Sequence, residues 1–170
     1  MLLSVVGSVL VLSCSQPPRE TVGSYRYDVP DPELWMPVPA QVDDSINFAS
    51  DEFAEVEYLQ RYNYVPGGAA ILVASVTLPQ SEPKESLASF LEGYAARWDR
   101  KDVTMQNFQR GNFYINQVIV DTGEFYIIKE AVFYRYWNEG FVIDIVTGKA
   151  HVKAMDDAVA SLLKSVRVSQ

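Results

Sequence analysis

The chain has 170 residues, of which 48% are hydrophobic and 21% are charged, a composition that excludes a disordered chain and is typical of one globular domain. Its net charge of −8 excludes the usual basic surface for nucleic acid. One cysteine and one histidine exclude an internal disulfide and a zinc site built from Cys and His, so we expect no metal and no cofactor.

The first thirteen residues form an apolar segment without a charged side chain. A bilayer span needs about 20 apolar residues, so this segment has the length of a signal-peptide core instead. Its end, Val11-Leu12-Ser13-Cys14, resembles the lipobox of bacterial lipoproteins. That resemblance implies cleavage before Cys14 and a lipid on Cys14. The alternative is a buried N-terminal strand or helix with an ordinary core cysteine.

Three parts of the chain follow from this interpretation. Residues 1–13 are expected to be the signal peptide, residues 14–24 the lipidated cysteine with its tether, and residues 25–170 the globular domain. The expected location is the cell envelope, with the chain anchored in a membrane through Cys14. Ser15 resembles a sorting signal for the outer membrane on its periplasmic side, if the cell has two membranes.

The first half of the domain is expected to contain strands. Tyr25–Val29 alternates and ends at Pro30, so it predicts a first strand whose exposed edge could pair with another chain. Prolines around Leu34-Trp35-Met36 exclude a central strand there. A short strand is expected at Ser45–Ala49. Ala54–Val65 fits a strand or a helix; the Pro66-Gly67-Gly68 turn and the strand Ala69–Leu78 after it favour a strand.

The second half is expected to place a meander between two helices. The helices are predicted at Ser81–Trp98 and His151–Val166, each with one apolar stripe. Four strands are expected between them, at Val103–Gln109, Phe113–Val120, Glu124–Trp137 and Phe141–Thr147. Both faces of these strands are largely apolar, as in a sheet that is covered on both sides. The predicted fold class is therefore a single α+β domain with a mostly antiparallel meander sheet covered by helices.

This element order is similar to the PsbP-like fold. The similar features are the first strand, Trp35 in a proline-rich stretch, the Pro-Gly-Gly hairpin, the helix, the meander and an ending in Ser165-Val166-Arg167-Val168. The resemblance implies an α/β/α sandwich over roughly Tyr25 to Val168. It also implies a non-enzymatic binding or assembly module, because proteins of that fold include PsbP and many bacterial lipoproteins. It implies no particular binding residue.

The acidic residues are concentrated in residues 28–57, where no Lys or Arg occurs. They are Asp28, Asp31, Glu33, Asp43, Asp44, Asp51, Glu52, Glu55 and Glu57. This segment could repel anionic lipid headgroups, dock a basic partner or hold Ca²⁺ weakly, although the order of acids differs from an EF-hand loop. It could equally be an irregular, solvated surface. These alternatives remain open at this stage.

Aromatic residues are the candidates for partner contact. Trp98 ends a helical stripe and is expected in the core, whereas Trp35 and Trp137 flank proline-rich or turn sequence and are expected to be more exposed. Tyr134 and Tyr136 lie beside Trp137 at a predicted hairpin end. We therefore expect a contact patch formed by Trp35, Tyr134, Tyr136 and Trp137.

The sequence contains no recognisable catalytic constellation, so no catalytic residue is expected. His151 has no accompanying nucleophile motif and is expected to be exposed at a helix start. Three acid pairs, Asp43 with Asp44, Asp99 with Asp102 and Asp156 with Asp157, could serve a hydrolase only if two carboxyls met across a cleft.

The favoured function is a membrane-anchored envelope lipoprotein that acts as a non-catalytic binding or assembly module. Its expected partners are the membrane, through Cys14, and an unidentified envelope protein, with no nucleic acid. The alternatives are an envelope hydrolase that uses paired carboxylates and a carrier of a small apolar ligand, which would need an internal cavity.

Overall fold

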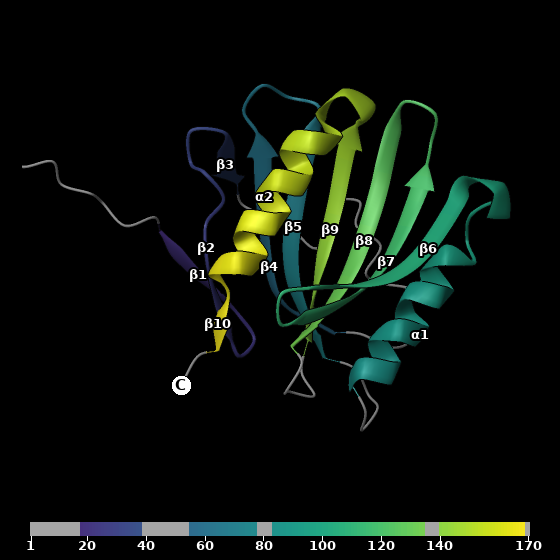
Figure 1. The fold of residues 1–170 in the computed structure, drawn as a ribbon, viewed down its shortest axis with the longest axis horizontal. Coiled ribbons are helices and arrows are strands. Elements are labelled where there is room, and N and C mark those ends of the chain that lie inside the picture. The colour runs from purple at the N-terminus through teal and green to yellow at the C-terminus, as the bar shows by residue number, and fades with distance from the viewer. Residues whose placement is uncertain (1–17, 39–54, 78–82, 135–139, 169–170) are drawn as a thin grey trace, which may run out of the picture.

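The structure is a computed structural model that describes residues 18–38, 55–77, 83–134 and 140–168. These residues form two antiparallel sheets, two α-helices and two short 3-10 turns (Figure 1). The larger sheet has seven strands in the order β3-β4-β5-β9-β8-β7-β6, and the smaller has the order β1-β2-β10.

The large sheet is built from hairpins, as the alternating and turn-bounded sequence predicts. Its strands are β3 Trp35–Val38, β4 Glu55–Tyr64, β5 Ala69–Thr77, β6 Val103–Arg110, β7 Phe113–Asp121, β8 Phe125–Tyr134 and β9 Gly140–Gly148. The prediction of a strand at Ala54–Val65 is thus confirmed. Gly111 and Gly123 turn two of the hairpins with φ of 61° and 94°, a region that glycine enters without steric cost.

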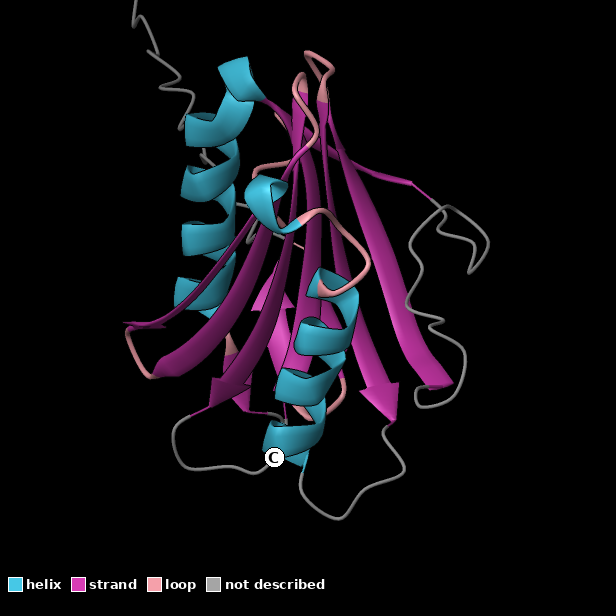
Figure 2. Ribbon diagram, turned by 90° about the vertical axis from the view of Figure 1, so that its right-hand side faces the viewer, coloured by secondary structure: helices cyan, strands magenta, loops and turns pink. Residues whose placement is uncertain are grey.

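The two faces of the large sheet carry separate apolar clusters. On one face, α1 (Pro83–Ala95) packs Leu91 and Tyr94 against β7 and β8. On the opposite face, α2 (Val152–Ser165) and the small sheet cover side chains of the other parity, such as Ile115 and Ile143. Helices therefore lie on both sides of the sheet (Figure 2), which confirms the predicted α+β domain with a covered meander.

The pattern of apolar residues in α2 explains why this segment is helical. Its apolar side chains recur at helical spacing and are all buried, whereas Asp156 and Asp157 are exposed on the other side. The buried set is Met155, Ala158, Val159, Leu162 and Leu163. After α2 the chain continues directly into β10 (Arg167–Val168), which pairs with β2 (Tyr25–Asp28).

The small sheet corrects two predictions about the start of the domain. Arg19–Val22 was expected to be part of a tether, but it forms β1 and pairs with β2. β2 was expected to have an exposed edge, yet it is the central strand between β1 and β10. The reason is burial: Val22 of β1 enters the core together with Tyr25 and Tyr27 of β2, so this segment packs as a strand. The strand expected at Ser45–Ala49 lies outside the described residues.

Candidate functional site

A groove lies beside the C-terminal end of α2. It has a volume of about 610 Å³, within the range of ligand pockets. We name it the C-terminal groove, and it is lined by Tyr25, Arg110, Gly111, Asn112, Phe113, Ala160, Leu163, Lys164, Val166, Arg167 and Val168. It opens at the surface and is not an internal cavity, which the ligand-carrier alternative would require.

Three elements that are distant in sequence form the groove. The β6–β7 hairpin supplies Asn112 and Phe113, the end of α2 supplies Leu163, and β2 supplies Tyr25. Phe113, Tyr25 and Leu163 are almost fully buried, and the ring of Tyr25 lies 5.4 Å from that of Phe141. The groove therefore has a fixed apolar floor.

The rim of the groove is basic. Arg110 forms an ion pair with Asp156 at 2.9 Å, while its second terminal nitrogen, Nη1, is buried and has no hydrogen-bond partner. Arg167 Nη1 donates to the carbonyls of Lys164 and Val166 at 2.9 and 2.8 Å, as cations often do at a helix C-terminus. An apolar floor beneath cationic groups suits an anionic group attached to an apolar body.

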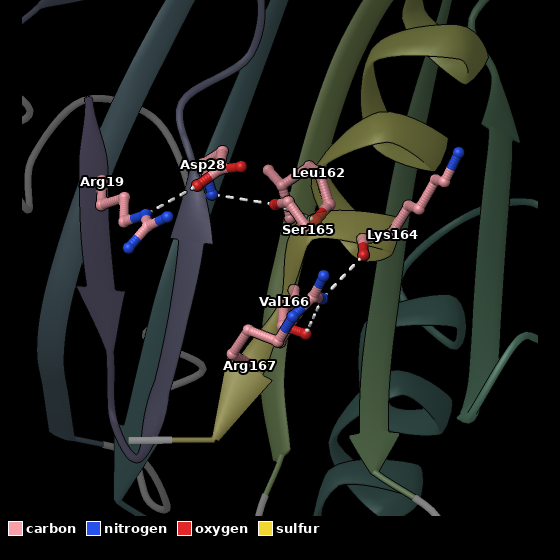
Figure 3. Close-up of polar contacts among 7 residues, drawn as sticks. All are labelled: Arg19, Asp28, Leu162, Lys164, Ser165, Val166 and Arg167. Atoms are coloured by element: carbon pink, nitrogen blue, oxygen red, sulfur yellow. Dashed lines mark hydrogen bonds and ion pairs between the residues drawn. The ribbon is translucent and has the colours of Figure 1, made fainter. Parts of the chain in front are cut away.

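Hydrogen bonds hold the small sheet against the end of α2 (Figure 3). The backbone N–H of Asp28 donates to Ser165 Oγ at 2.8 Å, and the Ser165 hydroxyl donates to the carbonyl of Leu162 at 2.7 Å. Arg19 Nε lies 3.3 Å from Asp28 Oδ1. The Ser165 hydroxyl therefore connects the small sheet to the end of α2 that lines the groove.

A buried ion pair lies under α1, on the face of the sheet away from the groove. Lys129 Nζ donates to Asp144 Oδ2 and lies 4.6 Å from the centre of the Tyr94 ring. Burial, with the nearby Asp144 charge, raises the pKa of Tyr94 to about 12. Burial raises the pKa of Asp144 as well, and the ammonium of Lys129 acts in the opposite direction. The pair therefore links the neighbouring strands β8 and β9 beneath α1.

A second polar group is buried on the α2 face. Gln106 Nε2 donates to Gln117 Oε1, and Gln117 Nε2 donates to Glu130 Oε1 at 2.6 Å. Glu130 Oε2 is buried without a hydrogen-bond partner. Burial is the main cause that raises the pKa of Glu130, and the hydrogen bond from Gln117 and the charge of Arg110 oppose it.

The predicted contact patch is not assembled in the structure. The expectation that Trp35 is exposed is wrong: the side chain is 2% exposed and its ring lies 4.9 Å from that of Tyr64. The turn context misled the prediction, because β3 is an edge strand whose Trp35 side chain faces the core. Tyr134 ends β8, and its side chain, Tyr136, Trp137 and Cys14 lie outside what the structure describes.

His151 is more enclosed than expected. Its side chain is half-buried against the Tyr64 ring, 5.5 Å between centres, beside Gly68. Gly68 has a φ of 75°, and a Cβ there would lie 2.9 Å from the His151 ring. Because Gly68 has no side chain, the His151 ring has room beside it. His151 thereby packs the β4–β5 turn against the start of α2.

The proposed acid pairs do not converge where they are described. Asp156 pairs with Arg110, Asp157 with Lys153 and Asp99 with Lys101, all at the surface. Asp43 and Asp44 lie outside the described residues, as does most of the acidic segment 28–57. Within the described part of the chain, no group of three or more His, Cys, Asp or Glu side chains could hold a metal ion.

Sequence reasoning missed the groove and both buried polar groups. Lys129, Glu130 and Asp144 could have been noticed, because they interrupt strands that are otherwise apolar on both faces. No comparable signal existed for Arg110, Lys164 and Arg167. They are ordinary surface residues in sequence, and only the packing of α2 beside the β6–β7 hairpin brings them together.

Comparisons with known proteins establish the fold. No family profile and no curated protein matches this sequence. The solution structure of cyanobacterial PsbP (CyanoP) from Synechocystis sp. PCC 6803 is similar, with a TM-score of 0.54 and 11% identity over 96% of this chain and 98% of that chain. The crystal structure of LpqN, involved in cell envelope biogenesis of Mycobacterium tuberculosis, has a TM-score of 0.47 and 13% identity over 87% of this chain and 86% of that chain.

The match to CyanoP confirms the predicted PsbP-like fold. At this identity it says nothing of function, and the lipid on Cys14 stays a prediction. Among the described residues, no helix is both long enough and apolar enough to cross a membrane.

Proposed function

We propose that this protein is a membrane-anchored cell-envelope lipoprotein that acts as a non-catalytic binding or assembly module. The anchor is a lipid on Cys14, inferred from Val11-Leu12-Ser13-Cys14. The binding site is the C-terminal groove, which accepts an anionic, partly apolar segment of an envelope protein. The observation that carries this proposal is the groove itself, with buried Tyr25 and Phe113 as its floor and cations at its rim.

The chemistry of the groove supports binding. Its apolar floor can exclude water from a docked segment, and charge-assisted hydrogen bonds are stronger where water is excluded. Arg110 lines the groove, so a carboxylate or phosphate placed at the rim would lie beside its guanidinium charge. Asp156 already holds one terminal nitrogen of Arg110 and so fixes the direction of the guanidinium group.

The experiment uses the full chain in native membranes, with a photo-crosslinking residue at Asn112, which lines the groove. The matched control places the same residue at Asn107, an asparagine on β6 that lines a smaller hollow of about 240 Å³ beside α1. Both side chains are exposed, so both positions can react equally well. We expect one envelope protein to be crosslinked from Asn112 and not from Asn107.

Mass spectrometry of the same material tests the anchor. We expect a mature chain that begins at Cys14 and carries acyl groups, and a Cys14→Ser chain that leaves the membrane fraction. An unmodified Cys14 in a soluble chain would contradict the anchor. An acylated Cys14 without any crosslink from Asn112, or with crosslinks from Asn107 alone, would instead contradict the role of the groove.

A further inference from the structure

The outer face of the small sheet has an unusual charge for this chain. Arg19, Thr21, Arg26 and Arg167 are exposed on that face, whereas Tyr25 and Tyr27 point inward to the core. Lys164 adjoins it in the exposed last turn of α2, as Figure 3 shows. We name Arg19, Arg26, Lys164 and Arg167 the basic face; it adjoins the C-terminal groove and shares Lys164 and Arg167 with the rim of that groove. The chain as a whole carries a net charge of −8, so this face opposes the overall trend.

The cations of the basic face are largely without countercharge. Arg26 lies directly opposite Arg167 in the pairing of β2 with β10, and like charges in that position destabilise a sheet. Among the described residues, no carboxylate pairs with Arg26, Lys164 or Arg167; Asp28 pairs with Arg19 alone. Two adjacent arginines without carboxylate partners are suited to an anionic surface, because each guanidinium can donate several hydrogen bonds to phosphate oxygens.

The basic face is also the part of the domain closest along the chain to the expected anchor. Pro18 is already fixed to the domain, because its carbonyl accepts a hydrogen bond from the Val29 N–H at 2.9 Å. Only four residue steps separate it from Cys14, which span at most about 14 Å at about 3.5 Å per residue. A lipid on Cys14 therefore keeps β1 within a short distance of the bilayer surface.

We propose that the basic face docks on the anionic phospholipid headgroups of the membrane that holds the anchor. The proposal takes its geometry from the proposed lipid on Cys14, and its chemistry from the charges of β1, β2, β10 and the end of α2. Headgroup phosphates are the anions within reach of that tether. Arg26 and Arg167 lie side by side, so they can contact the charged surface of a bilayer without a pocket that encloses each phosphate. Docking fixes the orientation of the domain on the bilayer.

The test uses the full chain with Cys14→Ser, so that no lipid contributes to binding. Vesicles of phosphatidylcholine are compared with vesicles that contain phosphatidylcholine and phosphatidylglycerol in equal parts. The apolar residues 1–13 would act on both kinds of vesicle, so the ratio of the two binding constants isolates the effect of headgroup charge. We expect tighter binding to the anionic vesicles, with a loss of the difference as salt is raised.

Two double variants test whether the basic face causes the tighter binding to anionic vesicles. Arg26→Gln with Lys164→Gln removes two charges but keeps Arg167, whose guanidinium also holds the helix carbonyls. The matched control, Arg100→Gln with Lys101→Gln, removes two exposed charges at the 3-10 turn Arg100–Asp102, on the other side of the molecule (Figure 1). We expect the first pair to weaken anionic binding about 25-fold, at about fivefold per charge, and the control to change it little.

Fluorophores attached at single positions test which part of the domain contacts the vesicle. Cys14→Ser leaves a chain without cysteine, so a single cysteine can be placed at Thr21 on the basic face or at Lys101 as a control. An environment-sensitive fluorophore at Thr21→Cys should respond to anionic vesicles, and one at Lys101→Cys should not. Equal binding to both vesicle types, equal effects of the two variant pairs or equal responses of the two fluorophores would each overturn the proposal. Because this chain lacks the lipid, none of these results depends on whether Cys14 is acylated.

Discussion

Three charged side chains, Lys129, Glu130 and Asp144, are buried within the central strands of the large sheet, at 1%, 3% and 3% exposure. Burial of a charge costs free energy unless a partner offsets the loss of water. Lys129 and Asp144 offset each other across β8 and β9, under the ring of Tyr94. Glu130 has only the amide of Gln117 as a hydrogen-bond partner, so it is the least compensated of the three.

Glu130 should therefore make stability fall with rising pH. Burial raises its pKa in the folded chain above the unfolded value, so the folded state holds the proton more tightly. The free energy of unfolding decreases as pH rises from the ordinary glutamate pKa through the folded one. Glu130→Gln keeps an oxygen for Gln117 and has no charge to bury, so we expect a smaller decrease.

Urea unfolding of wild type and Glu130→Gln between about pH 5 and about pH 8 measures this difference. Glu92→Gln is the control, because Glu92 is an exposed residue of α1. We expect the advantage of Glu130→Gln over wild type to grow with pH, while Glu92→Gln follows wild type. Parallel curves for wild type and Glu130→Gln would show that Glu130 does not titrate over this range.

At the scale of elements, the small sheet and α2 depend on each other. β10 follows α2 after a single residue, pairs with β2 and continues the covering layer over the Ile143 face of the large sheet. Ser165 joins the two elements, since its hydroxyl accepts from the Asp28 N–H and donates to the Leu162 carbonyl. A short strand such as β10, with two residues, needs this kind of support.

Ser165→Ala should lower the free energy of unfolding by about 1–3 kcal/mol, because the half-buried Asp28 N–H loses its acceptor. Chemical denaturation at neutral pH measures the change. Ser161→Ala is the matched control, a serine of the same helix with an exposed side chain, and we expect no loss there. A Ser165→Ala chain as stable as Ser161→Ala would mean that water satisfies Asp28 instead.

A comparison of predicted and observed element boundaries shows which local sequence patterns predict secondary structure. The helices and the meander strands were predicted close to their observed positions, because an apolar stripe or a turn-bounded alternation is a local signal. β1 was missed, since Arg19-Glu20-Thr21-Val22 has one apolar residue and therefore no apolar alternation. Its partner Tyr25–Asp28 was found, because two aromatic side chains of one parity alternate there.

For the whole molecule, the large sheet is shared by two apolar clusters on its opposite faces. The α1 cluster contains Leu91 and Val118, and the α2 cluster contains Trp35 and Ile115. Val118 and Ile115 belong to the same strand, β7. Loss of packing on either face should therefore unfold both, as expected of one cooperative domain.

Leu91→Ala tests this coupling. Leu91 is 1% exposed, and its truncation should cost about 2–5 kcal/mol of unfolding free energy. In a chain with Trp98→Phe and Trp137→Phe, the fluorescence of Trp35 reports the opposite face. We expect Leu91→Ala to shift the fluorescence and far-ultraviolet circular dichroism transitions to the same lower urea concentration. Separate transitions would mean that the two faces unfold independently.

By itself, the sequence determined that this is one α+β domain, where its helices and most of its strands lie, and that both faces of the sheet are covered. Those features follow from apolar periods of 2 and 3.6 residues, which are visible within a single short segment of sequence. It also carries the lipobox-like pattern at Cys14. Tertiary structure alone decided the strand order, the burial of Trp35, the C-terminal groove and the basic face. Tyr25, Arg110 and Lys164 are far apart in the chain, so no local pattern can encode that they meet.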